Sequence, residues 1–126
     1  MAMDFQTGID IEEIARFRQK EFAKNTRFYE RIFSAKEIEY CNKRFDPYVH
    51  FAGKFAAKEA ISKALNGIGR LPFFEIEIGN HKDGSPCAHI PKKYREKISA
   101  IQISISHTKD IATAVAVTVW NKKGTK

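Results

Sequence analysis

The 126-residue chain is 43% hydrophobic, which suits one globular domain with a modest core, and we expect a single domain over 1–126. Lys and Arg number 22 against 15 Asp and Glu, and the net charge of +7 favours an anionic partner such as a nucleic acid, a phosphate-bearing ligand or an acidic protein. Two cysteines, Cys41 and Cys87, form no CxxC motif and no Cys/His cluster. This pattern indicates neither a zinc site nor a disulfide scaffold, and we expect reduced thiols in an intracellular, cytoplasmic protein. We expect no export signal and no membrane span, because neither a basic-then-apolar leader nor an apolar run of about 18 residues occurs.

The first half of the chain predicts a strand followed by helices. The expected elements are a strand over 5–11, then helices over about 10–25, 34–43 and 47–65. Asp10 and Glu13 have the D-x-x-E spacing of a helix start, and Ser34 and Glu37 have the capping-box spacing of the next start. Pro47 suits the first position of the long helix, and the NGIG sequence after it supplies a glycine stop.

In the second half the apolar period changes from 3.6 to 2, the period of a strand. The expected elements are strands over 73–80, 87–90, 100–106 and 111–120, with a short helix over about 91–98. The segment 111–120 (IATAVAVTVW) is apolar on both faces, which predicts a central strand paired with 100–106 through the HTKD turn. This order of elements indicates an α+β fold, with helices packed on one face of a largely antiparallel sheet.

The long helix carries one acidic side chain, Glu59, among alanines, phenylalanines and lysines. Glu59 and Lys63 are one turn apart, so a solvated ion pair explains them as well as a functional site does. Two interpretations also fit Asp10, a helix cap or a ligand. Two fit His107 as well, a turn residue or a ligand. Two carboxylates with a lysine and a histidine suit Mg²⁺ and a phosphate ligand, because Mg²⁺ takes a few carboxylate oxygens and leaves positions for phosphate oxygens and water.

Three motifs in order narrow these alternatives: GIDIEEIARF (8–17), FAGKFAAKEAISKAL (51–65) and ISISHTKDIATAVAV (103–117). Together they resemble the holo-acyl-carrier-protein synthase family, the short group of 4'-phosphopantetheinyl transferases, over nearly the whole chain. The resemblance implies that family's fold, with a long helix and shorter helices packed on the sheet. It also implies transfer of the 4'-phosphopantetheine group of coenzyme A to a serine of apo acyl carrier protein, with release of adenosine 3',5'-bisphosphate, for fatty acid biosynthesis. The implied enzyme is cytoplasmic and Mg²⁺-dependent, with Mn²⁺ as the alternative metal.

The resemblance also assigns roles to single residues. Asp10 and Glu59 match the family's magnesium-binding acids, while Lys63 and His107 match the residues that contact the phosphates and the coenzyme. Glu59, Lys63 and His107 are thereby the expected catalytic residues. The base that activates the serine is either Glu59, directly or through water, or a metal-bound hydroxide, and the sequence leaves both open. The residues expected to bind coenzyme A are Asp10, Lys54, Glu59, Ser62, Lys63, Gly67, Pro86, His107 and Thr108.

Two positions depart from the family pattern. Lys54 stands where the family often has arginine, which keeps the charge but loses the bidentate fork for a phosphate. Ser85 stands at the basic position of the G-[KR]-P turn, so we expect one basic contact to coenzyme A to be missing there.

The resemblance further implies a homotrimer with its sites between subunits, and the apolar strand 111–120 supplies surface to bury. The division we expect places the residues matching Asp10 and His107 on one subunit and those around Glu59 and Lys63 on the next.

A series of basic residues begins at Arg16, near the end of the first motif, and continues beyond it. We call it the basic segment: Arg16, Lys20, Lys24, Arg27 and Arg31. Their spacing places them within roughly 80° on one face of a helix. Residues 16–31, with Arg18 included, hold six basic and two acidic side chains, a net +4. A solvated face would alternate in sign, so we expect the basic segment to dock the acidic carrier protein.

Two other functions compete with this interpretation. A nucleic-acid-binding module would need stacking aromatics, yet Phe51, Phe55, Phe73 and Phe74 lie in apolar-patterned segments and are predicted to be core. A catalytically silent relative that only binds coenzyme A or a carrier protein is disfavoured because both acids, Asp10 and Glu59, are present.

Overall fold

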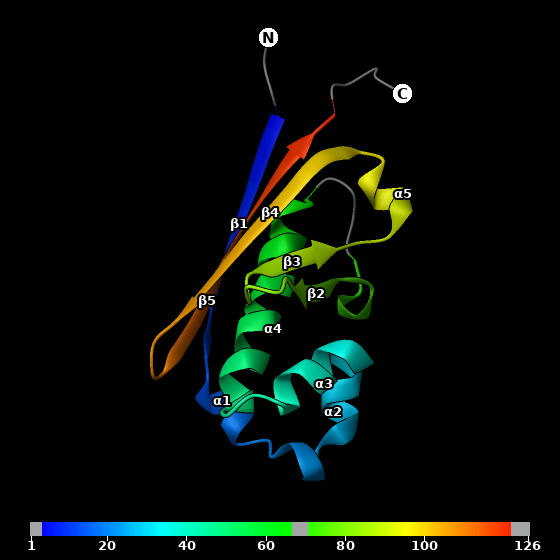
Figure 1. The fold of residues 1–126 in the computed structure, drawn as a ribbon. Helices are drawn as coiled ribbons and strands as arrows, with labels where there is room; N and C mark the ends of the chain where they lie inside the picture. Colours follow the sequence, from blue (N-terminus) through cyan, green and yellow to red (C-terminus); the bar gives the residue numbers. More distant parts are fainter. Residues whose placement is uncertain (1–3, 67–70, 122–126) are drawn as a thin grey trace.

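The computed structural model describes residues 4–66 and 71–121, and a long helix lying against one face of a three-stranded sheet dominates it (Figure 1). The helices and strands, in chain order, are β1 (Asp4–Glu13), α1 (Ala15–Arg18), η1 (Phe22–Lys24), α2 (Thr26–Ile32), α3 (Ala35–Asn42), α4 (Pro47–Ala64), η2 (Phe73–Glu75), β2 (Glu77–Asn80), β3 (Pro86–His89), α5 (Lys92–Arg95), β4 (Ile98–His107) and β5 (Ile111–Trp120). The predicted α+β class is confirmed. No helix among the described residues combines the length and the hydropathy of a membrane span.

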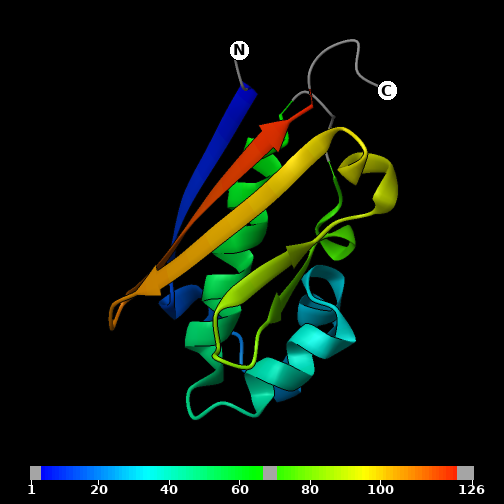
Figure 2. The same cartoon turned by 45° about the horizontal axis from the view of Figure 1, so that its top comes forward.

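The main sheet has the strand order β1-β5-β4, and both pairings are antiparallel. β5 is the central strand, and it forms the predicted hairpin with β4. β2 and β3 form a separate two-stranded sheet, which lies across α4 and next to β4 (Figure 2). β2 begins later than predicted, because residues 73–75 form the 3₁₀ turn η2.

The helix expected over about 10–25 is wrong. β1 continues through Glu13, and Asp10 pairs with Ala114 of β5, so ladder bonds to β5 take the place of a helix start. α1 ends at Arg18 because tertiary hydrogen bonds replace the next helical turn. The Tyr29 hydroxyl donates to the carbonyl of Lys20 at 2.7 Å, and the backbone N–H of Phe22 donates to the Tyr48 hydroxyl at 2.9 Å.

The other two helix starts are confirmed. Ser34 caps α3 in a capping box: its hydroxyl accepts from the backbone N–H of Glu37, and the Glu37 carboxylate accepts from the backbone N–H of Ser34. α4 begins at Pro47, where a missing N–H breaks no helical hydrogen bond.

α4 packs through two different surfaces. Its N-terminal half contributes Phe51 and Phe55 to an aromatic cluster with Phe17, Tyr29 and Phe33. Its C-terminal half packs alanines against Ala114 and Ala116 of β5. The core prediction holds for Phe51 and Phe55, but it is wrong for Phe74, whose side chain is 64% exposed.

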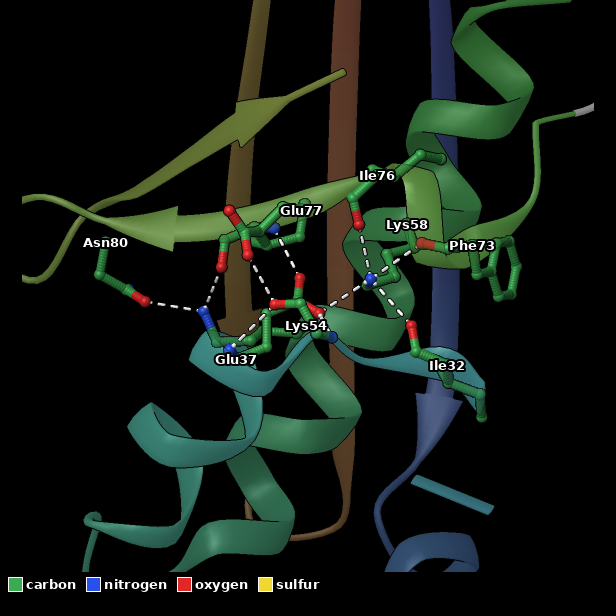
Figure 3. Close-up of polar contacts among 10 residues, drawn as sticks. Ile32, Glu37, Lys54, Lys58, Phe73, Ile76, Glu77 and Asn80 are labelled. Carbon is green, nitrogen blue, oxygen red and sulfur yellow. Dashed lines mark hydrogen bonds and ion pairs between the residues drawn. The ribbon is translucent and has the colours of Figure 1, made fainter. Parts of the chain in front are cut away.

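A fully buried ion pair joins α4 to α3 and to the segment before β2 (Figure 3). The Lys58 ammonium lies 2.9 Å from a carboxylate oxygen of Glu37 and donates to the backbone carbonyls of Ile32, Phe73 and Ile76. The other Glu37 oxygen accepts from the backbone N–H of Ile78 at 2.6 Å. Burial lowers the pKa of Lys58, while the Glu37 carboxylate opposes that shift. The motif residue Lys58 is therefore a structural clamp.

On β1 and β5 the sheet face away from α4 carries exposed apolar side chains, whereas on β4 it carries Gln102, Ser104 and Ser106. Phe5, Ile9 and Ile11 of β1 are 57%, 66% and 64% exposed, and Ile111 and Val115 of β5 are 36% and 38% exposed. We call these five residues the outer sheet face. They alternate along their strands with residues that face α4, as the period of a strand requires.

Candidate active site

Asp10 lies on the face of β1 that packs against α4. Its side chain is 14% exposed, and one carboxylate oxygen lies 3.7 Å from the Lys63 ammonium, which also donates to the carbonyl of Ile9 at 2.8 Å. The second oxygen, Oδ2, is buried and has no hydrogen-bond partner among the described residues. An unpaired buried carboxylate oxygen is costly, so this atom is open to a cation.

The close approach of β1 to α4 depends on Gly8. A Cβ at that position would lie 1.9 Å from the Ala60 carbonyl oxygen and 2.9 Å from Lys63 Cβ. The missing side chain lets Asp10, two residues further along β1, reach Lys63. Asp10, Lys63, Ile9, Ile11 and Thr113 line a hollow of about 270 Å³, which we call the Asp10 hollow.

Glu12, which faces α4 like Asp10, is an acid that the sequence analysis missed. It is 8% exposed, and it accepts a hydrogen bond of 2.7 Å from Arg16. Burial raises the pKa of Glu12 to about 7, with contributions from the Asp10 carboxyl and from the charge of Glu59, against the opposing charge of Arg16. Strand alternation is the signal that could have found Glu12, since a strand through residue 13 places residues 8, 10 and 12 on one face.

Glu59 is partly buried on α4, one turn before Lys63. Asp10, Glu12 and Glu59 form an acidic group between β1 and α4, but no three Asp, Glu, His or Cys side chains among the described residues converge to hold a metal on their own. The orphaned oxygen of Asp10 and the hard oxygen donors fit Mg²⁺ or Mn²⁺ only if a ligand or water supplies further oxygens.

His107 lies at the end of β4 and lines a different hollow from Asp10. This His107 hollow, of about 220 Å³, is lined in part by His107, His50, Lys54, Pro86 and Tyr40. Burial lowers the pKa of His50, and the charges of Arg44, His107 and Lys54 lower it further. The structure therefore gathers the predicted residues into two separate places, Asp10 with Lys63 and Glu59, and His107 with Lys54 and Pro86.

This grouping corrects the expected division between subunits. Asp10 and Lys63 were placed on opposite subunits, yet one chain brings them into contact, because Gly8 seats β1 directly on α4. His107 is the residue that stands apart from Asp10 within the chain.

Oxygen atoms of the protein itself already accept hydrogen bonds from the Lys54 ammonium. It is 3% exposed, and its ammonium donates to the carbonyl of Ile78 at 2.8 Å and to the side-chain oxygen of Asn80 at 2.7 Å (Figure 3). It also lies 4.6 Å from the centre of the Tyr40 ring, and burial lowers its pKa. Lys54 lines the His107 hollow and an adjoining cavity of about 460 Å³, so it holds β2 at the edge of both.

The remaining residues expected at the coenzyme site differ in their surroundings. The Ser62 hydroxyl is buried without a hydrogen-bond partner among the described residues. The Thr108 hydroxyl accepts from the backbone N–H groups of Asp110 and Ile111 and thereby stabilises the β4–β5 turn. Gly67 lies outside the described residues.

The basic segment does not lie on one helical face, so that prediction is wrong. Its members lie on α1, in the following loop, on η1 and on α2, because tertiary hydrogen bonds end α1 early. All five remain exposed. Arg16 is tied to Glu12 by an ion pair, whereas no described carboxylate lies within ion-pair distance of Arg27 or Arg31.

Residues 6–118 match the family described as the 4'-phosphopantetheinyl transferase superfamily. The chain belongs to this superfamily. A curated member of it, the holo-[acyl-carrier-protein] synthase of Chlamydia felis, is 45% identical over 114 residues, which cover 87% of this chain and 93% of that protein. The resemblance carried by the three motifs is confirmed.

Solved structures of phosphopantetheinyl transferases share the fold. The Helicobacter pylori holo-[acyl-carrier-protein] synthase in complex with coenzyme A has a TM-score of 0.79 at 37% identity, covering 89% of this chain and 98% of that chain. The Bacillus anthracis synthase, in complex with CoA (3',5'-ADP), has a TM-score of 0.78 at 33% identity, covering 95% of this chain and all (100%) of that chain.

Proposed function

We propose that this chain transfers the 4'-phosphopantetheine group of coenzyme A to a serine of an apo acyl carrier protein and releases adenosine 3',5'-bisphosphate. The observation that carries the proposal is the Asp10 carboxylate, which is held against Lys63 with one buried oxygen unpaired. Both side chains lie within residues 6–118, which match the superfamily, and its members include a holo-[acyl-carrier-protein] synthase solved with coenzyme A. We place the reaction in the cytoplasm, in keeping with two free cysteines.

Asp10 and Glu59 are the proposed ligands of Mg²⁺, with Mn²⁺ as the alternative. The metal, when bound, neutralises charge at the pyrophosphate of coenzyme A. Lys63 is exposed enough to reach a phosphate while its ammonium stays oriented by Asp10 and by the carbonyl of Ile9. Gly8 fixes this geometry by keeping β1 close to α4.

His107, Lys54 and Pro86 form the proposed nucleotide side of the site. Lys54 acts there mainly by positioning β2, because two protein acceptors already hold its ammonium. The Asp10 hollow and the His107 hollow share no lining residue, so we propose that each catalytic site combines the first hollow of one subunit with the second hollow of a neighbour.

A homotrimer in which the outer sheet face is buried would bring such hollows together, and closed symmetry would cover the face on every copy. Sedimentation or light scattering tests this. Ile9→Asp should dissociate the assembly, while Phe45→Asp, at a fully exposed residue outside the sheet, should leave it intact. A wild-type monomer with full activity at micromolar concentration would contradict the trimer.

The transfer itself is tested by incubating the protein with coenzyme A, Mg²⁺ and an apo acyl carrier protein, and weighing the carrier by mass spectrometry. We expect the added mass of one phosphopantetheine group, and we expect its loss when the metal is chelated with EDTA. A carrier that binds but never gains mass would instead establish a catalytically silent relative. Product formed at full rate in EDTA would remove the metal from the proposal.

A further inference from the structure

A shallow hollow beside η2 takes no part in the proposed chemistry. It has a volume of about 500 Å³ and is lined by Arg31, Leu71, Pro72, Phe73 and Phe74. Four of these five side chains are apolar, and Arg31 is the one charged group in the lining. We call it the Phe74 hollow.

Within the part of the chain that the structure describes, most of the Phe74 side chain is left uncovered. Its neighbour Phe73 turns inward and packs edge-on against Phe55 of α4, with ring centroids 5.4 Å apart, so Phe73 supplies the core contact of η2. Phe74 remains 64% exposed beside an arginine that has no ion pair among the described residues. Exposed aromatic residues next to arginine are typical of the anchors of protein interfaces.

Hydrogen bonds from a buried lysine fix the two segments that line the Phe74 hollow. Lys58 donates one hydrogen bond to the carbonyl of Ile32, at the end of α2, and another to the carbonyl of Phe73, in η2 (Figure 3). The same buried ammonium thus fixes the helix that carries Arg31 against the turn that carries Phe74. A rigid anchor loses little conformational entropy when a partner binds.

The charge next to the hollow indicates the kind of partner. Arg31 is the last member of the basic segment and lies one helical turn after Arg27 on α2. Residues 16–31 carry a net charge of +4, from six basic and two acidic side chains. A partner that covers both Arg31 and Phe74 must present carboxylates next to an apolar side chain.

We propose that the Phe74 hollow binds an aliphatic or methionine side chain of the acidic carrier protein, while Arg31 pairs with an adjacent carboxylate of that carrier. The proposal rests on the proposed function, because it takes the carrier as the partner. It adds an apolar anchor to a docking surface that is otherwise electrostatic. Charges along the basic segment steer the encounter, and the anchor holds the complex.

The test compares Phe74→Gln with Phe74→Leu, which keeps apolar bulk, and with the matched control Phe45→Gln at another exposed phenylalanine outside the hollow. Each variant is titrated with apo carrier protein in a calorimeter without coenzyme A, and KM is measured for both substrates. We expect Phe74→Gln to raise Kd and KM for the carrier about tenfold, with KM for coenzyme A unchanged. Phe74→Leu and Phe45→Gln should stay within about threefold of wild type.

An unchanged carrier Kd in Phe74→Gln overturns the anchor. A smaller assembly for Phe74→Gln by sedimentation also overturns it, and assigns the hollow to a contact between copies of the chain. The two proposals fail separately: a wild-type protein that neither binds nor modifies any carrier rejects the proposed function, whereas normal transfer by both wild type and Phe74→Gln rejects the anchor alone.

Discussion

Replacement of Lys58 by methionine should destabilise the protein strongly while leaving its shape intact. Methionine matches the length of the lysine stem but removes the cation from a pair in which both side chains are fully buried. The Glu37 carboxylate would then stay buried without its partner, and the carbonyls of Ile32, Phe73 and Ile76 would lose a donor. Breaking a buried ion pair from one side costs about 3–5 kcal/mol.

Thermal unfolding followed by circular dichroism, at one fixed protein concentration, measures this cost. Each kcal/mol corresponds to about 3–5 °C in Tm for a chain of this size, so we expect a fall of about 10–25 °C. Glu37→Gln serves as the second arm, and the double variant with Lys58→Met should lose less stability than the two single variants added together, because it contains no lone buried charge. A loss below about 1 kcal/mol for Lys58→Met, which is the range of exposed pairs, would refute the clamp.

Asp10→Ala and Glu59→Ala should each abolish phosphopantetheine transfer with an unchanged circular dichroism spectrum; near-wild-type turnover in either would remove the metal assignment. Arg27→Glu should raise KM for the carrier protein and not for coenzyme A, and wild-type association should weaken with added salt; an equal effect on both substrates would place Arg27 outside the docking surface. Iodoacetamide at pH 8 should label Cys87 and spare Cys41 in the folded protein, because burial raises the pKa of Cys41 to about 12 and keeps it a thiol. Mass mapping that finds Cys41 labelled as fast as Cys87 would contradict the packing of α3 on α4.

Sequence patterns predicted the elements whose signals are local. Pro47 and a long apolar period located α4, and alternation located the β4–β5 hairpin. The start of the first helix was mistaken because D-x-x-E is compatible with a strand as well as with a helix cap. The extent of β1 is set by its partner β5, at the other end of the sequence, and no local pattern reports that pairing.

The candidate-site residues that lie in motifs could be predicted from the sequence. Residues whose roles depend only on packing could not. Asp10, Glu59 and Lys63 were assigned by motif, and Asp10 and Lys63 lie in contact. The burial of Glu12 and the clamp role of Lys58 were missed, because the first depends on the packing of β1 against α4 and the second on Glu37, both distant in sequence. A charged residue is ordinarily exposed, so Lys58 carried no local sign of its burial, and alternation could mark Glu12 as buried only once β1 was known to continue through Glu13.

The antiparallel pairing of β1 with β5 has a consequence for synthesis of the chain. The Thr113 hydroxyl donates to the Asp10 carbonyl at 2.8 Å across a separation of 103 residues, and the ladder between the two strands runs from Asp4 and Trp120 to Glu13 and Ile111. A ribosome delivers β1 first and β5 last, so a nascent chain that stops before Ile111 contains α4 and Lys63 but offers β1 no partner strand. The β1–β5 ladder and the Thr113 wall of the Asp10 hollow can therefore form only after β5 has emerged, so an incomplete chain cannot complete this hollow while translation is still under way.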